Sequence, residues 1–295
     1  MEPETETTKK NWYDKNYKLL LLIPLILITF SIIYMVVFYS THGDLFYRDV
    51  SLTGGTTITI SEKIDIEKLT KDLSPKLEDF RTREIYDILT GEQTAVVIET
   101  STGGTETKEI LEDYLGYELT TENSSFEFTG SILSESFERQ LLIAILIAFI
   151  FMAIVVFILF RTFVPSAAVI LSAFANILMT LVFVNIIGIK MSTAGIVALL
   201  MLIGYSVDTD ILLTTRVLKR REGSINERIF GSFKTGITMT FTSLFAISFA
   251  LIIVKSFSET LAQIFTILII GLCFDIPNTW ITNASIIKWY AESKK

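Results

Sequence analysis

Two aspartates, Asp208 and Asp210, lie inside one long apolar stretch of the sequence, and Asp275 lies inside a later one. A carboxylate at the middle of a bilayer costs roughly 2.5–3.5 kcal/mol on insertion scales, so such residues usually face a helix bundle and carry a function. A carboxylate in a low-dielectric interior is also harder to ionise, so it can exchange a proton near neutral pH. The three aspartates therefore indicate proton transfer within a membrane.

The first two aspartates cannot share a helix face, because two residues correspond to about 200° of helical rotation. Asp208 falls in a row with Gly204, whereas Asp210 falls in a row with Ser206 and Thr214. We predict that one row meets other helices of this chain and that the other row meets a partner.

Asp208 and Asp275 are the stronger candidates for a proton relay, because helix packing does not require a carboxylate. Asp210 lies closer to Arg216, and an ion pair between them would explain it equally well. Lys234 could approach a carboxylate and favour its ionised form, and its withdrawal would favour protonation. A proton relay of this kind would be coupled to helix movement.

Small and polar residues accompany the aspartates at helical spacing in the last four apolar stretches. Pro277 interrupts the backbone ladder beside Asp275 and frees a carbonyl for water or a neighbouring side chain. Such residues are also common in ordinary helix packing, where their hydrogen bonds average under about 1 kcal/mol, so both interpretations stay open. The candidate residues of this polar seam are Asn176, Thr238, Thr242, Asn278 and Thr282.

Composition excludes most other chemistry. Of 295 residues, 51% are hydrophobic and 19% are charged, whereas a soluble domain carries about 25% charged residues. The net charge of −7 argues against nucleic acid as a partner. The single cysteine, Cys273, and the single histidine, His42, exclude a disulfide and a Cys/His zinc site. We expect no metal, no cofactor, no ATP-binding loop and no enzymatic activity.

The aspartates must be positioned by membrane-spanning helices, each of which needs about 20 mostly apolar residues. Outside the polar segment 42–140, lysine and arginine concentrate in the two tails and in the loops on the same side of the membrane as the tails. Positively charged loops favour the cytoplasm, so both termini are expected there. We therefore predict a multi-pass protein of the cell membrane with cytoplasmic tails at 1–18 and 288–295. The predicted spans are 19–39 and a five-helix bundle over 141–287, made of 141–160, 164–187, 191–213, 236–254 and 261–287.

One polar segment, 42–140, separates the first span from the second and is predicted to be an extracytoplasmic domain. Its pattern gives the order β-α-β-β-α-β, which indicates a ferredoxin-like α+β fold. The predicted elements are 56–60, 65–77, 82–89, 94–100, 105–117 and 124–133. Paired glycines at Gly54 and Gly55 indicate either a close backbone approach or a plain kink at the membrane exit. The fold class is thus an α-helical membrane protein with six transmembrane helices and one such domain between helices 1 and 2.

Three motifs carry a family resemblance: Thr53-Gly54-Gly55-Thr56, then Gly204-Tyr205-Ser206-Val207-Asp208 followed by Arg216, then Phe233-Lys234-Thr235. Their order, spacing and topology resemble the SecF branch of the SecD/SecF family of protein-export membrane proteins, within the resistance-nodulation-division superfamily. The extracytoplasmic motif comprises Gly54, Gly55 and Thr56.

The chain departs from the bacterial pattern of this family at several positions. Asp208 and Thr209 stand where bacterial members have Asn and Asp, Lys234 stands for an arginine, and Asp275 replaces a small residue. The run 275–283 is similar to the archaeal branch. A relay role for Asp208 follows from the resemblance, whereas a role for Asp210 or Asp275 is inferred from their apolar surroundings.

The resemblance implies an accessory subunit that uses the proton gradient to promote polypeptide translocation and release. The implied partners are a SecD-like subunit with a similar six-span bundle, the Sec translocation channel, the translocating polypeptide and membrane lipid. Two alternatives stay open. A half-size exporter of hydrophobic small molecules would need an apolar pocket in the external domain, and an assembly scaffold would not need the aspartates.

Overall fold

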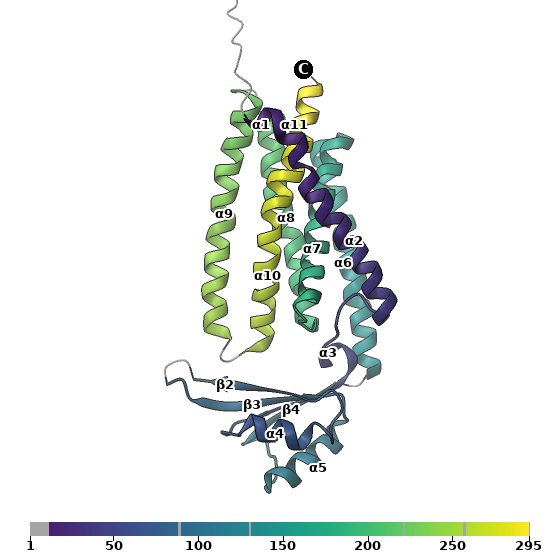
Figure 1. Cartoon of the computed structure of the whole chain (residues 1–295), viewed down its shortest axis with the longest axis vertical. Coiled ribbons are helices and arrows are strands. Elements are labelled where there is room, and N and C mark those ends of the chain that lie inside the picture. Colours follow the sequence, from purple (N-terminus) through teal and green to yellow (C-terminus); the bar gives the residue numbers. More distant parts are fainter. Residues whose placement is uncertain (1–11, 88–89, 130, 221, 256–257, 295) are drawn as a thin grey trace, which may run out of the picture.

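The computed structural model describes residues 12–87, 90–129, 131–220, 222–255 and 258–294. Within them, six helices are long and apolar enough to cross a membrane. They lie side by side as a bundle, with a small α+β domain at one end and helix α1 and the C-terminus at the other (Figure 1). We call these ends the domain side and the termini side. The predicted fold class is confirmed.

The helices follow the apolar stretches of the sequence, with short amphipathic or capping extensions at several ends. The first span, Asn16–His42, combines α1 (Trp12–Leu20) and α2 (Leu22–His42). The other spans are formed by α6 (Ser131–Phe160), α7 (Phe163–Ile186), α8 (Thr193–Lys219), α9 (Ile225–Val254), α10 (Glu259–Pro277), the π-helix η1 (Asn278–Asn283) and α11 (Ala284–Ser293).

The domain between α2 and α6 is a four-stranded antiparallel sheet in the order β2-β3-β1-β4, covered on one face by two helices. This is the strand order of the ferredoxin-like split motif. Ile58 and Ile98 of the sheet pack against Leu69 and Leu111 of the helices in one buried cluster. The elements are α3 (Val50–Thr53), β1 (Gly55–Ile60), α4 (Ile66–Leu73), β2 (Arg81–Tyr86), β3 (Gln93–Thr100), α5 (Gly104–Leu115) and β4 (Ser124–Thr129).

Several element boundaries differ from the predictions, among them the end of the last strand and the start of α9. The last strand ends at Thr129, and α6 begins at Ser131, so 131–133 is helical rather than extended. No glycine or proline occurs between there and Phe160, so nothing in the sequence stops the membrane helix from continuing outward. Helix α9 begins well before residue 236, because the Ser224 side chain and Glu227 form a capping box at its start.

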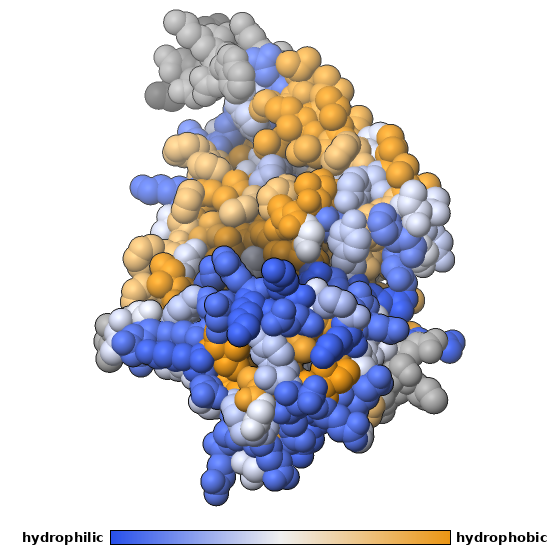
Figure 2. All heavy atoms as spheres, turned by 60° about the horizontal axis from the view of Figure 1, so that its bottom comes forward, coloured by the Kyte–Doolittle hydropathy of each residue, from blue (hydrophilic) through white to orange (hydrophobic). Residues whose placement is uncertain are grey.

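The hydropathy of the molecular surface differs between the α+β domain and the helix bundle. Seen with the domain forward, the domain is mostly hydrophilic and the helices behind it are mostly hydrophobic (Figure 2). The domain is tied to the bundle where the loop after α7 meets the segment after α2. There Met191 N donates to Tyr47 O at 2.7 Å, and Asp49 N donates to Met191 O at 3.0 Å.

Among the apolar clusters of the described bundle residues, one lies toward each end. The domain-side cluster contains Phe46, Leu52, Val184, Met191, Ile196, Ala198, Leu199, Leu202, Ile267 and Leu268. The termini-side cluster contains Ala168, Leu213, Val217, Ile225, Ile229, Trp280, Ala284 and Ile287. Between them, α7, α8 and the α10–η1 segment bring polar side chains together.

Candidate functional site

Asp210 lies in the bundle interior and is completely buried. Its Oδ1 accepts hydrogen bonds from Asn283 Nδ2 at 2.8 Å and from Ser172 Oγ at 3.2 Å. Its second oxygen, Oδ2, has no hydrogen-bond partner among the described residues. The carboxylate therefore joins α8 to α7 and η1 and keeps one oxygen free.

Asp275 is also completely buried and is held mainly by α8. Ser206 Oγ donates to its Oδ1 at 2.5 Å, and Thr209 Oγ1 lies 3.0 Å from its Oδ2. Thr279 Oγ1 is 3.5 Å from Oδ1 and 3.3 Å from Thr209 Oγ1. These hydroxyls connect Asp275 on α10 with the same helix that carries Asp210.

The two carboxylates differ from typical buried charges in their lack of ion pairs to the described lysine and arginine residues. Within the described part of the chain, no lysine or arginine forms an ion pair with Asp210 or Asp275. Other fully buried polar atoms of the bundle also have no hydrogen-bond partner within the described ranges: both amide atoms of Asn176, Asn278 Oδ1 and Asn283 Oδ1, with the nearly buried Thr282 Oγ1. Buried polar groups are usually satisfied, if not by protein then by ordered water. The site therefore suits water molecules as well as protons.

Burial distinguishes the two rows of α8. Ser206, Asp210 and Thr214 face the interior and are buried, whereas Gly204 and Asp208 are exposed. Of the two stronger sequence candidates, Asp208 thus lies on the outer surface of the bundle, whereas Asp275 is completely buried. An exposed carboxylate on a membrane-spanning helix marks a surface that requires a polar or protein neighbour.

The candidate residues of α9 are not brought to the buried carboxylates. Lys234, Thr238 and Thr242 are exposed, and the hydroxyls of the two threonines bond to backbone carbonyls of their own helix. Arg216 does not pair with Asp210. Its Nη1 donates instead to Gly231 O at 3.1 Å and to Thr235 Oγ1 at 2.8 Å.

Sequence reasoning missed three of the buried contacts, those made by Thr209, Thr279 and Asn283. A regular α-helix would place Asn278 and Thr282 on the face of Asp275, but the π-helix that follows Pro277 widens the turn and changes the register. Asn278 and Thr282 are buried, yet Asn283 is the residue that reaches Asp210. Pro277 was the sequence signal for this change.

The paired glycines lie at the junction between α3 and β1. Gly54 ends α3 with a φ of 82°, and Gly55 starts β1 with a φ of 152°. A Cβ on Gly55 would collide with Thr100 O and would lie 2.6 Å from Val50 Cγ1. Thr56 Oγ1 donates to Thr102 O at 2.8 Å. The motif therefore allows the backbone at Gly55 to lie close to Thr100 of β3, where the chain enters the domain.

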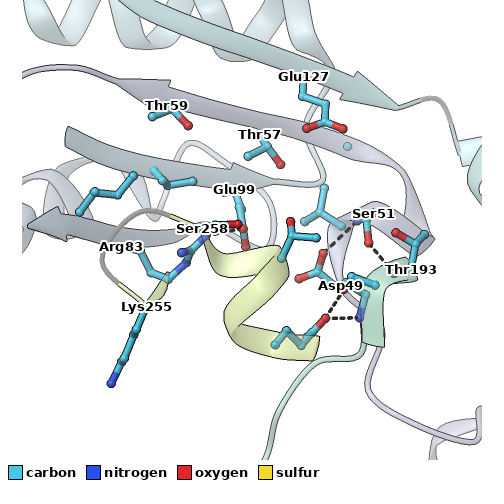
Figure 3. Close-up of a pocket in the computed structure, with 18 of the residues that line it drawn as sticks. Asp49, Ser51, Thr57, Thr59, Arg83, Glu99, Glu127, Thr193, Lys255 and Ser258 are labelled. Atoms are coloured by element: carbon cyan, nitrogen blue, oxygen red, sulfur yellow. Dashed lines mark hydrogen bonds and ion pairs between the residues drawn. The ribbon is translucent and has the colours of Figure 1, made fainter. Parts of the chain in front are cut away.

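A polar crevice of about 450 Å³ separates the open face of the sheet from the domain-side ends of α8 and α10 (Figure 3). Arg83 of β2 forms an ion pair with Glu99 of β3 at 3.1 Å, and Asp49 lies on the opposite wall. Burial and the nearby Glu99 raise the pKa of Asp49, although the Ser51 amide and Lys190 act in the other direction. The crevice is lined mainly by polar and charged side chains, with Val50, Ile85, Val97 and Ala194 among them.

The described residues contain no group of three or more His, Cys, Asp or Glu side chains that could hold a metal ion. The buried site is therefore built from two carboxylates, hydroxyls and amides. Such groups can bind, release and orient protons and water.

Comparison with known proteins matches residues 110–293 to the family described as protein export membrane protein SecD/SecF, C-terminal. The protein-export membrane protein SecF of Methanocaldococcus jannaschii is 40% identical over 283 residues, which cover 94% of this chain and 96% of that protein. SecF of Methanothermobacter thermautotrophicus is 38% identical over 285 residues, 94% of each chain.

The fold has also been seen in a crystal structure. SecDF of Thermus thermophilus, described as a translocon-associated membrane protein, matches with a TM-score of 0.74 at 17% sequence identity. The match covers 97% of this chain and 39% of that longer chain. With the full-length relatives at up to 40% identity, the chain belongs to the SecD/SecF family of protein-export membrane proteins, as a SecF member.

Proposed function

We propose that this chain acts with a SecD-like subunit at the Sec translocation channel and uses the proton gradient to promote polypeptide translocation and release. The observation that carries the proton-coupling role is the pair of fully buried carboxylates, Asp210 and Asp275, which form no ion pair with any lysine or arginine among the described residues. Two uncompensated charges in a low-dielectric interior are costly, so the pair retains at least one proton. Proton release then requires a change in the surroundings of the pair.

The hydroxyl of Thr209 identifies one place for that proton. Thr209 Oγ1 lies 2.9 Å from Ser206 O and 3.0 Å from Asp275 Oδ2, but it has a single proton to donate. If it donates to the carbonyl, Asp275 Oδ2 must be the donor toward Thr209. A proton on Asp275 completes this set of hydrogen bonds, and its loss forces the hydroxyl to turn. Proton transfer is thereby linked to contacts between α8 and α10.

The partner surface in this proposal is the outer row of α8 with the adjacent part of α9. Asp208 and Gly204 are exposed there, as are Thr238 and Thr242 of α9. The Asp208 carboxylate would be unfavourable against lipid tails, whereas a second helix bundle with polar side chains would satisfy it. This supports a SecD-like bundle as the neighbour. The SecDF structure, of which this chain spans 39%, is consistent with it.

We place both termini in the cytoplasm. Arg161, Arg216, Lys219, Arg228 and Lys234 belong to helix ends and loops on the termini side. Positively charged loops favour the cytoplasm. The α+β domain then lies outside, where translocated polypeptides emerge.

The polar lining of the crevice weighs against an exporter of hydrophobic small molecules, which would need an apolar pocket beside the domain. A passive scaffold remains the useful alternative for experiment. It requires assembly with the partner but no titrating carboxylate.

The test is export into vesicles that contain the channel, the partner chain and this chain, with and without a proton gradient. Asp275→Asn and Asp210→Asn should each abolish at least nine-tenths of the gradient-dependent increment, while the complex still co-purifies. Asp208→Asn should instead reduce co-purification of the partner. Thr29→Val, at an exposed position of α2, is the matched control. Full gradient dependence in both interior variants would support the scaffold and refute proton coupling.

A further inference from the structure

The buried carboxylates lie between two bulky side chains, each of which rests on a glycine of a neighbouring helix. Toward the domain side, Leu202 of α8 rests on Gly271 of α10. Toward the termini side, Trp280 of η1 rests on Gly236 of α9. We propose that Leu202–Gly271 and Trp280–Gly236 are the outer and inner seals of the proton site, that is, apolar contacts that keep bulk water away from the carboxylates. This inference rests on the function proposed above.

The outer seal is one helical turn from Asp275. Leu202 precedes Ser206 by four residues and Gly271 precedes Asp275 by four residues, which corresponds to about 6 Å along each helix. Leu202 is completely buried, and a Cβ on Gly271 would lie 2.5 Å from its Cδ1. Only glycine lets the leucine side chain close the space between the two helices.

Further apolar residues extend the outer seal toward the crevice. Leu199, Ile267 and Leu268 belong to the same domain-side cluster as Leu202. Beyond them, Gln263 and Thr193 line the polar crevice (Figure 3). The crevice can hold water at the membrane surface, whereas the apolar layer below it excludes water from Asp275. A hydrophobic constriction of this kind stops ion passage by dewetting.

The inner seal has an analogous construction. A Cβ on Gly236 would lie 2.8 Å from Trp280 Cη2, so the indole ring also occupies a notch that only glycine provides. Its ring packs edge-on against Phe233, with centroids 5.3 Å apart and an angle of 90°. Leu213 and Val217 of α8 belong to the same termini-side cluster. Water from the termini side is thereby kept away from Asp210.

Trp280 has one feature that favours movement. Its Nε1 is buried and has no hydrogen-bond partner among the described residues. A buried indole N–H usually finds a partner, and leaving it unmade costs free energy. The present position of the ring is therefore maintained by packing alone, and a rotated ring could recover a hydrogen bond. We infer that the structure is the state in which both seals are closed.

Accessibility of a single cysteine tests the seals independently of export. The reporter is Ser206→Cys beside Asp275, in a Cys273→Ser background, in the complex with its partner within sealed membrane vesicles of either orientation. A small, charged, membrane-impermeant methanethiosulfonate should react slowly from both sides. Adding Leu202→Ala should raise the rate at least tenfold from the domain side only, and Trp280→Ala from the termini side only.

Leu272→Ala is the matched control, because Leu272 is equally buried beside Gly271 but is not a member of the domain-side cluster. It should leave both rates within about twofold of the parent rate. Leu202→Val and Trp280→Phe replace the alanine variants if these fail to assemble, and they should show smaller changes on the same sides.

Equal acceleration from both sides, no acceleration in any seal variant, or rapid labelling of the parent would overturn the proposal. The labelling rates do not depend on proton coupling. Side-specific labelling together with unchanged gradient dependence in Asp275→Asn would therefore refute the proposed function and keep the seals. Labelling without side specificity, together with loss of gradient dependence in Asp275→Asn, would refute only the seals.

Discussion

Asn283 donates a hydrogen bond from Nδ2 to Asp210 Oδ1 at 2.8 Å, and both side chains are completely buried. The bond joins the π-helix at the end of α10 to the middle of α8. It exists because the wider turn after Pro277 moves Asn283 onto the face that meets α8. The π-helix is thus the local structure that completes the carboxylate site.

We predict that Asn283→Ala lowers the free energy of unfolding by about 1–3 kcal/mol, because Asp210 loses the shorter of its two hydrogen bonds at a completely buried position. Thermal unfolding of the purified complex in detergent measures this change. Thr242→Ala, at an exposed position of α9, should change it by less than about 0.5 kcal/mol. Equal losses in both variants would show that the Asn283 contact contributes nothing specific.

Hydrophobic patterning predicted much of this architecture. Six long apolar stretches could only be membrane helices, and alternation with two helical segments indicated the ferredoxin-like order of the domain. The helical rows of α8 also separated Asp210 from Asp208 correctly. Which row faces inward could not be predicted, because both rows carry a carboxylate and the choice depends on packing with α7 and α10.

The remaining differences have local physical causes. Residue spacing alone assumes a constant helical period, so it placed Asn278 and Thr282 beside Asp275 and overlooked Asn283. Similarly, Lys234 follows helical spacing with Thr238, but the α9 face that they share is exposed. Sequence periodicity identifies a common face; it does not determine what that face contacts.

Gly55→Ala should unfold the external domain at lower temperature, by the equivalent of about 1–3 kcal/mol. The new Cβ would collide with Thr100 O, and a φ of 152° is unfavourable for alanine. Gly103→Ala is the control, since a Cβ there meets nothing within 4 Å. Limited proteolysis of the domain across a temperature series distinguishes the two. Resistance of the Gly55 variant equal to that of the control would exclude a required close approach.

The docking of the domain should depend on pH through Asp49. Its pKa is raised from 3.8 mainly by burial, so the folded state binds the proton more tightly than the unfolded state. The corresponding stability is present below about pH 4 and is lost as the pH rises through the folded-state value. Asp49→Asn, which can still cap α3, should therefore stabilise α3 at neutral pH and flatten the pH dependence.

Hydrogen exchange of the α3 amides between about pH 4 and pH 7, corrected for the intrinsic exchange rates, provides the measurement. A variant with weaker protection at neutral pH, or with the same pH slope as the parent, would contradict this assignment of Asp49.

Lys288 of α11 should hold the N-terminal helix against the bundle. It is completely buried, and its Nζ lies 4.5 Å from the ring centroid of Tyr13 and 4.9 Å from that of Tyr17. Nζ also donates to Asn226 Oδ1 at 2.7 Å. Lys288→Met keeps the length but removes the charge, so it should destabilise this contact by about 1–3 kcal/mol.

Hydrogen exchange of α1 should report that change as faster exchange in Lys288→Met. Lys294→Met is the control, because Lys294 is exposed and its ring contact is with Tyr290 of its own helix. Unchanged protection of α1 in the Lys288 variant would mean that apolar packing alone holds α1 in place.

In the proposed function, the Asp210–Asp275 pair holds a proton between α8 and α10. Infrared difference spectroscopy of the intact complex, recorded between acidic and alkaline pH, detects the carbonyl band of a buried protonated carboxylic acid. We predict a titrating band in the parent protein that is lost in Asp275→Asn and kept in Asp208→Asn. A band unchanged in Asp275→Asn and Asp210→Asn, or absent from the parent at every pH, would contradict the account.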